Sequence, residues 1–144
     1  EAILPAIAAR QLEQLEAALK PERGAPASPI ARIKLALRLV AEDPLCEAEL
    51  AHQRFAAMMQ HRDAGPNHAL RDLLADQVRQ AQTVGEIRPE LDPLYLAVVI
   101  RSLFFQRLAM WHQGHRPSPL PDLIDGVVDL LLEGTAGPSW VAPR

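Results

Sequence analysis

The chain has 144 residues, of which 49% are hydrophobic and only 4% aromatic, and this composition fits one globular domain with a mainly aliphatic core. Eighteen acidic residues outnumber fifteen basic ones. Non-specific binding to DNA depends on clustered lysine and arginine, so this chain alone is not expected to bind DNA. The first residues carry no basic segment typical of a signal peptide, and Arg101 and Arg107 interrupt the longest apolar run. We therefore expect a cytoplasmic protein without a membrane partner.

Apolar residues recur at spacings of three and four along the chain, which predicts an all-α fold. Many of the thirteen prolines stand where helices are expected to begin. Ser28, Asp43 and Asp92 each precede such a proline and are expected to cap a helix, and Asn67 and Ser118 are further candidate caps. The predicted helices cover residues 2–19, 29–42, 44–61, 67–84, 93–113 and 119–133.

The predicted helix 93–113 is apolar on nearly every side. Its polar residues Arg101, Ser102, Gln106 and Arg107 point in different directions when the helix is wound at about 100° per residue, so they form no continuous hydrophilic face. An ordinary surface helix has an apolar stripe that covers only part of its circumference. Packing on one side against the core would therefore leave apolar surface of this helix exposed to water, so we expect a second element to bury the rest.

The last predicted helix, 119–133, has a narrow acidic stripe and is otherwise apolar. Asp122, Asp125, Asp129 and Glu133 form the stripe, which we interpret as a solvated face. Together with helix 93–113 it predicts a helical hairpin that meets its copy in a four-helix bundle, so that the protein is a homodimer. The alternative is a monomer with a central helix. The expected dimer contacts are Val99, Ser102, Leu103, Gln106, Met110, Leu120, Leu123, Ile124, Val127, Val128 and Leu131.

The segment QTVGEIRPELDP at residues 82–93, followed by an apolar helix that ends near Trp111, resembles the C-terminal domain of TetR-type transcriptional regulators. Residues 1–4 are similar to the start of the helix that follows the DNA-binding head in that family, and residues 122–134 are similar to its last helix. The resemblance implies a six-helix regulatory domain at 1–136, with residues 137–144 as an irregular tail. It also implies dimerisation through the last two helices, and a missing N-terminal helix-turn-helix head as the part that binds operator DNA.

The resemblance further implies a pocket for a small, mostly apolar effector whose binding makes a repressor release DNA. Methionine and phenylalanine suit such a pocket, although core packing is the competing interpretation for each residue. Arg101 needs an acidic partner, water or an anionic ligand, because a buried unpaired charge is costly. The candidate ligand-binding residues are His52, Phe55, Met58, Met59, Leu74, Gln77, Val78, Arg101, Phe104, Phe105 and Leu108.

Catalytic motifs are missing from the sequence. It contains no phosphate-binding or dinucleotide-binding glycine motif, and its five histidines lack the spacing of a metalloprotease. Cys46 is expected to be a small apolar residue rather than a reactive thiol. We therefore predict no enzyme, no cofactor and no metal. The alternatives are a small helical metal-dependent enzyme that uses His112 and His115, and a helical adaptor whose apolar hairpin binds another protein.

Overall fold

A computed structural model of the chain describes residues 3–43 and 65–141. These residues are mainly helical and contain no strand, which confirms the predicted all-α fold. The third predicted helix, 44–61, lies outside the described residues, so the count of six helices stays a prediction. The described helices are α1 (Ile3–Ala18), α2 (Pro29–Glu42), α4 (Gly65–Thr83), α5 (Pro93–His112) and α6 (Leu120–Glu133), with a short 3-10 helix η1 (Pro21–Arg23).

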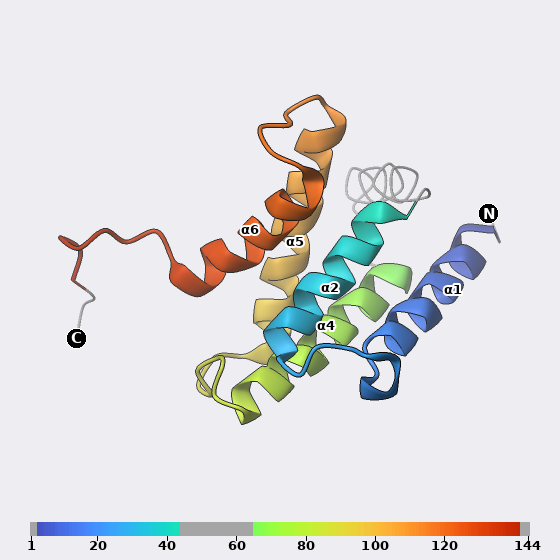
Figure 1. Ribbon diagram of the computed structural model, residues 1–144, viewed down its shortest axis with the longest axis horizontal. Coiled ribbons are helices and arrows are strands. Elements are labelled where there is room, and N and C mark those ends of the chain that lie inside the picture. The colour runs from blue at the N-terminus through green and yellow to red at the C-terminus, as the bar shows by residue number, and fades with distance from the viewer. Residues whose placement is uncertain (1–2, 44–64, 142–144) are drawn as a thin grey trace.

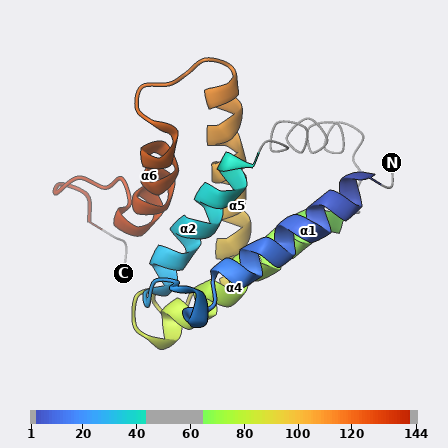
Figure 2. The same ribbon diagram turned by 45° about the vertical axis from the view of Figure 1, so that its right-hand side comes forward.

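Helix α4 is the centre of the arrangement, because it contacts α1, α2 and α5 (Figure 1). Helix α1 lies along α4 over most of its length (Figure 2). Helix α6 packs on α2 and α5. After α6, the chain leaves the helices without regular structure, and Trp140 in this stretch is 61% exposed.

Two of the predicted helix caps are confirmed. The Ser28 hydroxyl accepts a hydrogen bond from the backbone N–H of Ala31 at 3.1 Å, and the Asp92 carboxylate accepts one from Leu94 N–H at 3.1 Å. In both helices a proline follows the cap, where its missing N–H costs no hydrogen bond. These two caps fix the starts of α2 and α5 at the predicted residues.

The caps predicted for α4 and α6 are wrong. Helix α4 begins at Gly65, so Asn67 lies inside its first turn. Helix α6 begins at Leu120, with Pro119 in the capping position and no side-chain cap. A cap at Ser118 would place Pro121 third in the helix, where a residue normally offers its N–H to the cap. Proline has no N–H to offer.

Asp43 was expected to cap the helix 44–61, which lies outside the described residues. Within them, it ends α2, and its carboxylate accepts a hydrogen bond from Gln11 Nε2 at 3.1 Å. This bond joins the end of α2 to α1.

The core is built almost entirely from aliphatic side chains, as the low aromatic content predicts. The largest fully buried side chains come from four helices, α2, α4, α5 and α6, so these helices share one core. They are Ile33, Leu37, Leu74, Val78, Phe104, Leu108 and Ile124.

The acidic stripe of α6 is only partly solvated, which corrects our interpretation of it. Asp129 lies 2.7 Å from Lys34 Nζ, and Asp125 Oδ1 lies 3.5 Å from Arg38 Nε. Both cations belong to α2. The Asp125 oxygen is buried and makes no hydrogen bond, so the ion pair with Arg38 is the contact that offsets its burial. Half of the stripe therefore docks α6 on α2.

Helix α5 has 20 residues and is long and apolar enough to cross a membrane by length and composition alone; it is the one such helix among the described residues. Two arginines, which we expected to exclude a span, are too few to do so by this measure. About 33% of the 18-residue apolar window within this helix is buried inside the protein. A core helix passes the same test, so this finding is weak evidence for a membrane span.

Candidate functional site

The segment between α4 and α5, residues 84–92, is called the connector below. Gly85 has a φ of +86°, in the left-handed region that favours glycine. This turn lets the N–H groups of Glu86 and Ile87 donate to the Ala81 carbonyl at 2.8 and 3.3 Å. The connector therefore folds back tightly on the last turn of α4.

A glutamine on α4 holds the second half of the connector. Gln82 Nε2 donates to the carbonyl oxygens of Arg88 at 3.1 Å and Leu91 at 2.8 Å. Because both bonds leave from one side chain, the connector keeps a fixed shape between the end of α4 and the start of α5.

The connector is also bonded to the start of α2. Glu86 accepts a hydrogen bond from the Ile30 backbone N–H at 3.1 Å and one from the Ser28 hydroxyl at 2.5 Å. A carboxylate at a helix N-terminus is favourable, because the helix dipole places positive charge there. The connector thus joins three helix ends, those of α4, α2 and α5.

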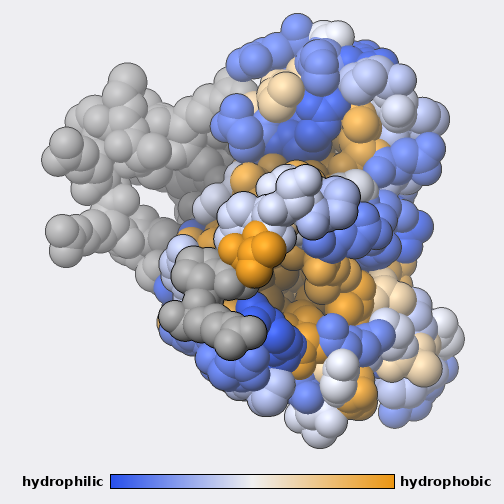
Figure 3. Space-filling model, turned by 90° about the vertical axis from the view of Figure 1, so that its left-hand side faces the viewer, coloured by the Kyte–Doolittle hydropathy of each residue, from blue (hydrophilic) through white to orange (hydrophobic). Residues whose placement is uncertain are grey.

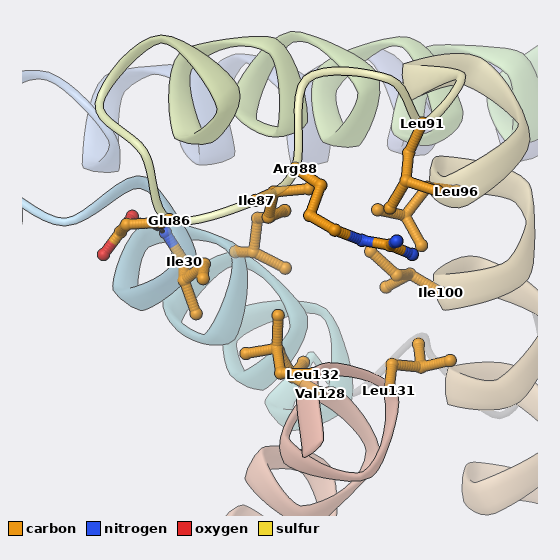
Figure 4. A pocket seen from close by; sticks show the side chains of 11 residues that line it. Ile30, Glu86, Ile87, Arg88, Leu91, Leu96, Ile100, Val128, Leu131 and Leu132 are labelled. Atoms are coloured by element: carbon orange, nitrogen blue, oxygen red, sulfur yellow. Dashed lines mark hydrogen bonds between the residues drawn. The ribbon is translucent and has the colours of Figure 1, made fainter. Parts of the chain in front are cut away.

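A cavity of about 260 Å³ opens beside the connector, between α2, α5 and α6 (Figure 4). On the face of the molecule drawn in Figure 3, apolar residues gather at the middle, between hydrophilic regions. Apart from Glu86 and Arg88, all residues that line the cavity are aliphatic, which is typical of sites for small apolar ligands. The aliphatic residues are Ile30, Ile33, Ile87, Leu91, Leu96, Ile100, Val128, Leu131 and Leu132.

None of the predicted ligand-binding residues that the structure describes lines this cavity. His52, Phe55, Met58 and Met59 lie outside the described residues. The fully buried Leu74, Val78, Phe104 and Leu108 pack the core, and Phe105 is partly buried, with its ring centroid 5.1 Å from that of Phe104. A second cavity, of about 340 Å³ and lined by residues of α1 and α2 and by Asp43, contains none of the described ligand-binding candidates either.

Two of the polar candidates, Gln77 and Arg101, lie within the described residues. Gln77 is only 6% exposed, and its side-chain oxygen accepts a hydrogen bond from Arg32 Nε at 2.8 Å, so that oxygen already has a partner within the chain. The pKa of Arg101 is lowered, first because burial disfavours its charge and second because Arg71 is also positive.

The cavity residues that sequence reasoning missed come from the connector. Ile87 is 7% exposed and Leu91 is partly buried, although both belong to a stretch rich in charged residues. The signal that could have identified them is that these two large apolar residues are spaced four apart within a charged stretch. Val128 and Leu131, which we assigned to the dimer contact, also line the cavity.

The predicted dimer residues divide by exposure. Ile124, Val127 and Val128 are buried within the chain's own core, so their side chains are not available for direct contact with a second copy. The others lie at the surface or are partly buried: Val99, Ser102, Leu103, Gln106, Met110, Leu120, Leu123 and Leu131. Leu130, which we did not predict, is 50% exposed, and Leu103 is 38% exposed. We call the exposed residues of α5 and α6, among them Leu103 and Leu130, the hairpin surface.

The histidine pair named in the metal alternative lies near the end of α5. Arg107 places one guanidinium nitrogen 3.0 Å from His115 Nδ1 and donates with the other to the His115 carbonyl at 3.1 Å. A metal ion at this ring nitrogen would face the arginine charge. Within the part of the chain that the structure describes, no group of three or more possible metal ligands occurs.

Comparison of the chain with protein-family models, with curated proteins and with solved structures gives no match.

Proposed function

We propose that this chain is the effector-sensing and dimerisation domain of a TetR-like transcriptional repressor, whose DNA-binding head lies outside this sequence. The resemblance of residues 82–93 suggests the family. The observation that carries the proposal is the aliphatic cavity, because the connector that forms one wall is bonded to the last turn of α4. A ligand in the cavity would therefore contact the connector, which is bonded to the end of α4.

The mechanism that we propose is a shift between two conformers. On one side of the cavity, the connector leads to α4, and α4 lies along α1, which would continue into the DNA-binding head (Figure 2). On the other side are α5 and α6, which would form the dimer bundle. An effector that binds better to the conformer with a displaced α4 raises the population of that conformer. The two heads would then no longer fit half-sites about 34 Å apart.

The homodimer is supported by the hairpin surface. Exposed apolar side chains on two neighbouring helices suit a symmetric contact, in which each hairpin covers its copy. The exposed polar residues Ser102 and Gln106 lie near Leu103 on α5 and would allow hydrogen bonds across such a contact.

We expect the protein to sediment as a dimer and the double variant Leu103→Lys, Leu130→Lys to sediment as a monomer. Two lysines on each copy would bring like charges together in the contact and leave them without water. The matched control is Val84→Lys, which changes a 63% exposed residue on the connector and should leave the dimer intact. Sedimentation equilibrium over a range of concentrations measures both. A wild-type monomer at all concentrations, or a double variant that stays dimeric, would contradict the proposed dimer.

A bound effector should change the distance between the two copies of α1. Spin labels at the exposed Glu16→Cys, in a Cys46→Ser background, report this distance in the dimer by pulsed electron paramagnetic resonance. The effector is a compound chosen from a small-molecule library because it raises the melting temperature. Labels at Glu133→Cys on α6 serve as the control and should keep their distance. Unchanged distances at both positions with saturating compound would contradict the mechanism.

A further inference from the structure

We infer that the cavity beside the connector binds a small aliphatic monocarboxylate, with its alkyl chain among the aliphatic side chains and its carboxylate on Arg88. This inference rests on the proposed function and names the chemical class of the effector. It uses a different set of residues from those that the sequence predicted.

The walls of the cavity select for an alkyl chain. They come from α2, the connector, α5 and α6, and the described lining residues include no aromatic side chain. Flat ring systems commonly bind against aromatic faces, and ligands with several polar groups need buried partners for them. The volume of about 260 Å³ lies just below the usual range for ligand pockets, so the ligand is small.

Arg88 supplies the charge that selects for a carboxylate. Among the described residues it is the one cation that lines the cavity, and its side chain extends from the connector toward Leu96 and Ile100 (Figure 4). The acidic residue at the cavity, Glu86, is already bonded to Ser28 and Ile30. Its carboxylate is turned away from Arg88 (Figure 4).

Arg88 can exchange its present partner for a ligand. It lies 3.6 Å from Glu90, and the two side chains are 72% and 63% exposed. An ion pair this exposed contributes little to stability, so giving it up costs little. A ligand carboxylate held at the mouth of an apolar cavity would instead receive two parallel N–H bonds from the guanidinium, a geometry that arginine favours.

The test is isothermal titration calorimetry of the full chain with straight-chain carboxylates from butanoate to decanoate and with the 1-alkanols of equal length. We expect the affinity for carboxylates to rise about fourfold with each added methylene until the cavity is full, and then to stop rising. At equal length, carboxylates should bind at least about tenfold more tightly than alkanols, because a hydrogen bond to a charged group is stronger than a neutral one.

Two variants assign the binding to these residues. Arg88→Gln should lower carboxylate affinity to that of the alkanols and leave alkanol affinity unchanged, whereas the control Arg79→Gln, an exposed arginine on α4, should change neither. Leu96→Trp should fill the cavity and abolish binding of both series. If Leu96→Trp fails to fold, as judged by circular dichroism, Ile30→Phe replaces it.

Equal affinities for carboxylates and alkanols, or a full affinity for carboxylates in Arg88→Gln, would overturn the inference. Absence of carboxylate binding at millimolar concentration would overturn it as well. The proposed function fails separately, in the sedimentation and spin-label experiments. A dimer that responds to a different class of compound would keep the proposed function and reject the carboxylate.

Discussion

Truncation of Phe104 to alanine is expected to lower the free energy of unfolding by about 3–5 kcal/mol. Phe104 has no exposed surface and is the largest fully buried side chain in the described core. The loss combines the transfer of the ring to water with the cavity that remains, because the surrounding helices relax only partly. For a chain of this size, the expected fall in melting temperature is about 10 °C. Urea unfolding followed by circular dichroism measures the change.

The matched control for Phe104→Ala is Tyr95→Ala, on the same helix. Tyr95 is 69% exposed, so its truncation should change the free energy of unfolding by less than about 1 kcal/mol. A similar small loss for Phe104→Ala would show that α5 is not packed against the core as described.

Replacement of Arg32 by alanine is expected to cost about 2–3 kcal/mol, the second largest effect. Its guanidinium donates to the side-chain oxygens of Gln77 and Gln80, each at 2.8 Å, and to the carbonyls of Pro26 and Ala27 at 2.9 and 3.0 Å. Gln77 is nearly buried, so the variant would leave its oxygen without a donor and away from water. The same urea titration measures this loss.

Two further variants separate the hydrogen bonds from the charge. Arg32→Lys keeps the charge but cannot reproduce the planar set of donors, so it should recover only part of the loss. In a double-mutant cycle, Gln77→Leu removes the side-chain oxygen that Arg32→Ala would leave without a donor. Arg32→Ala should therefore lower the free energy of unfolding by less in the Gln77→Leu background than in the wild type. Additive losses would contradict the coupling. The exposed Arg79→Ala should have little effect.

The sequence predicted the helices well where a cap and a proline agree. Ser28 and Asp92 each have a following residue with a free N–H within reach of the cap oxygen, so local chemistry decides where the helix starts. At Ser118 a second proline removes that N–H, and the start moves along the chain. The acidic stripe of α6 was misinterpreted because Lys34 and Arg38 belong to another helix, and periodicity on one helix does not show which helix packs beside it.

The cavity could not be predicted in the same way. Sequence reasoning placed the pocket where Met and Phe residues gather, and that placement stays a prediction, because the residues 44–61 that would form one wall lie outside the described residues. Of its described members, Phe104 and Leu108 are fully buried. A cavity forms where helix ends meet and side chains fail to fill the space, and that depends on how the helices cross. Ile87 and Leu91 show this, because both line the cavity in a connector whose conformation depends on the turn at Gly85 and on the hydrogen bonds of Gln82.

The bond between Ser28 and Glu86 joins residues 58 positions apart. A ribosome makes the chain from its N-terminus, at about 5–20 residues per second. The first turn of α2 therefore emerges several seconds before the carboxylate that completes it. In that interval the apolar face of α2 lacks part of α4 and all of α6, the two later helices that pack on it in the folded chain.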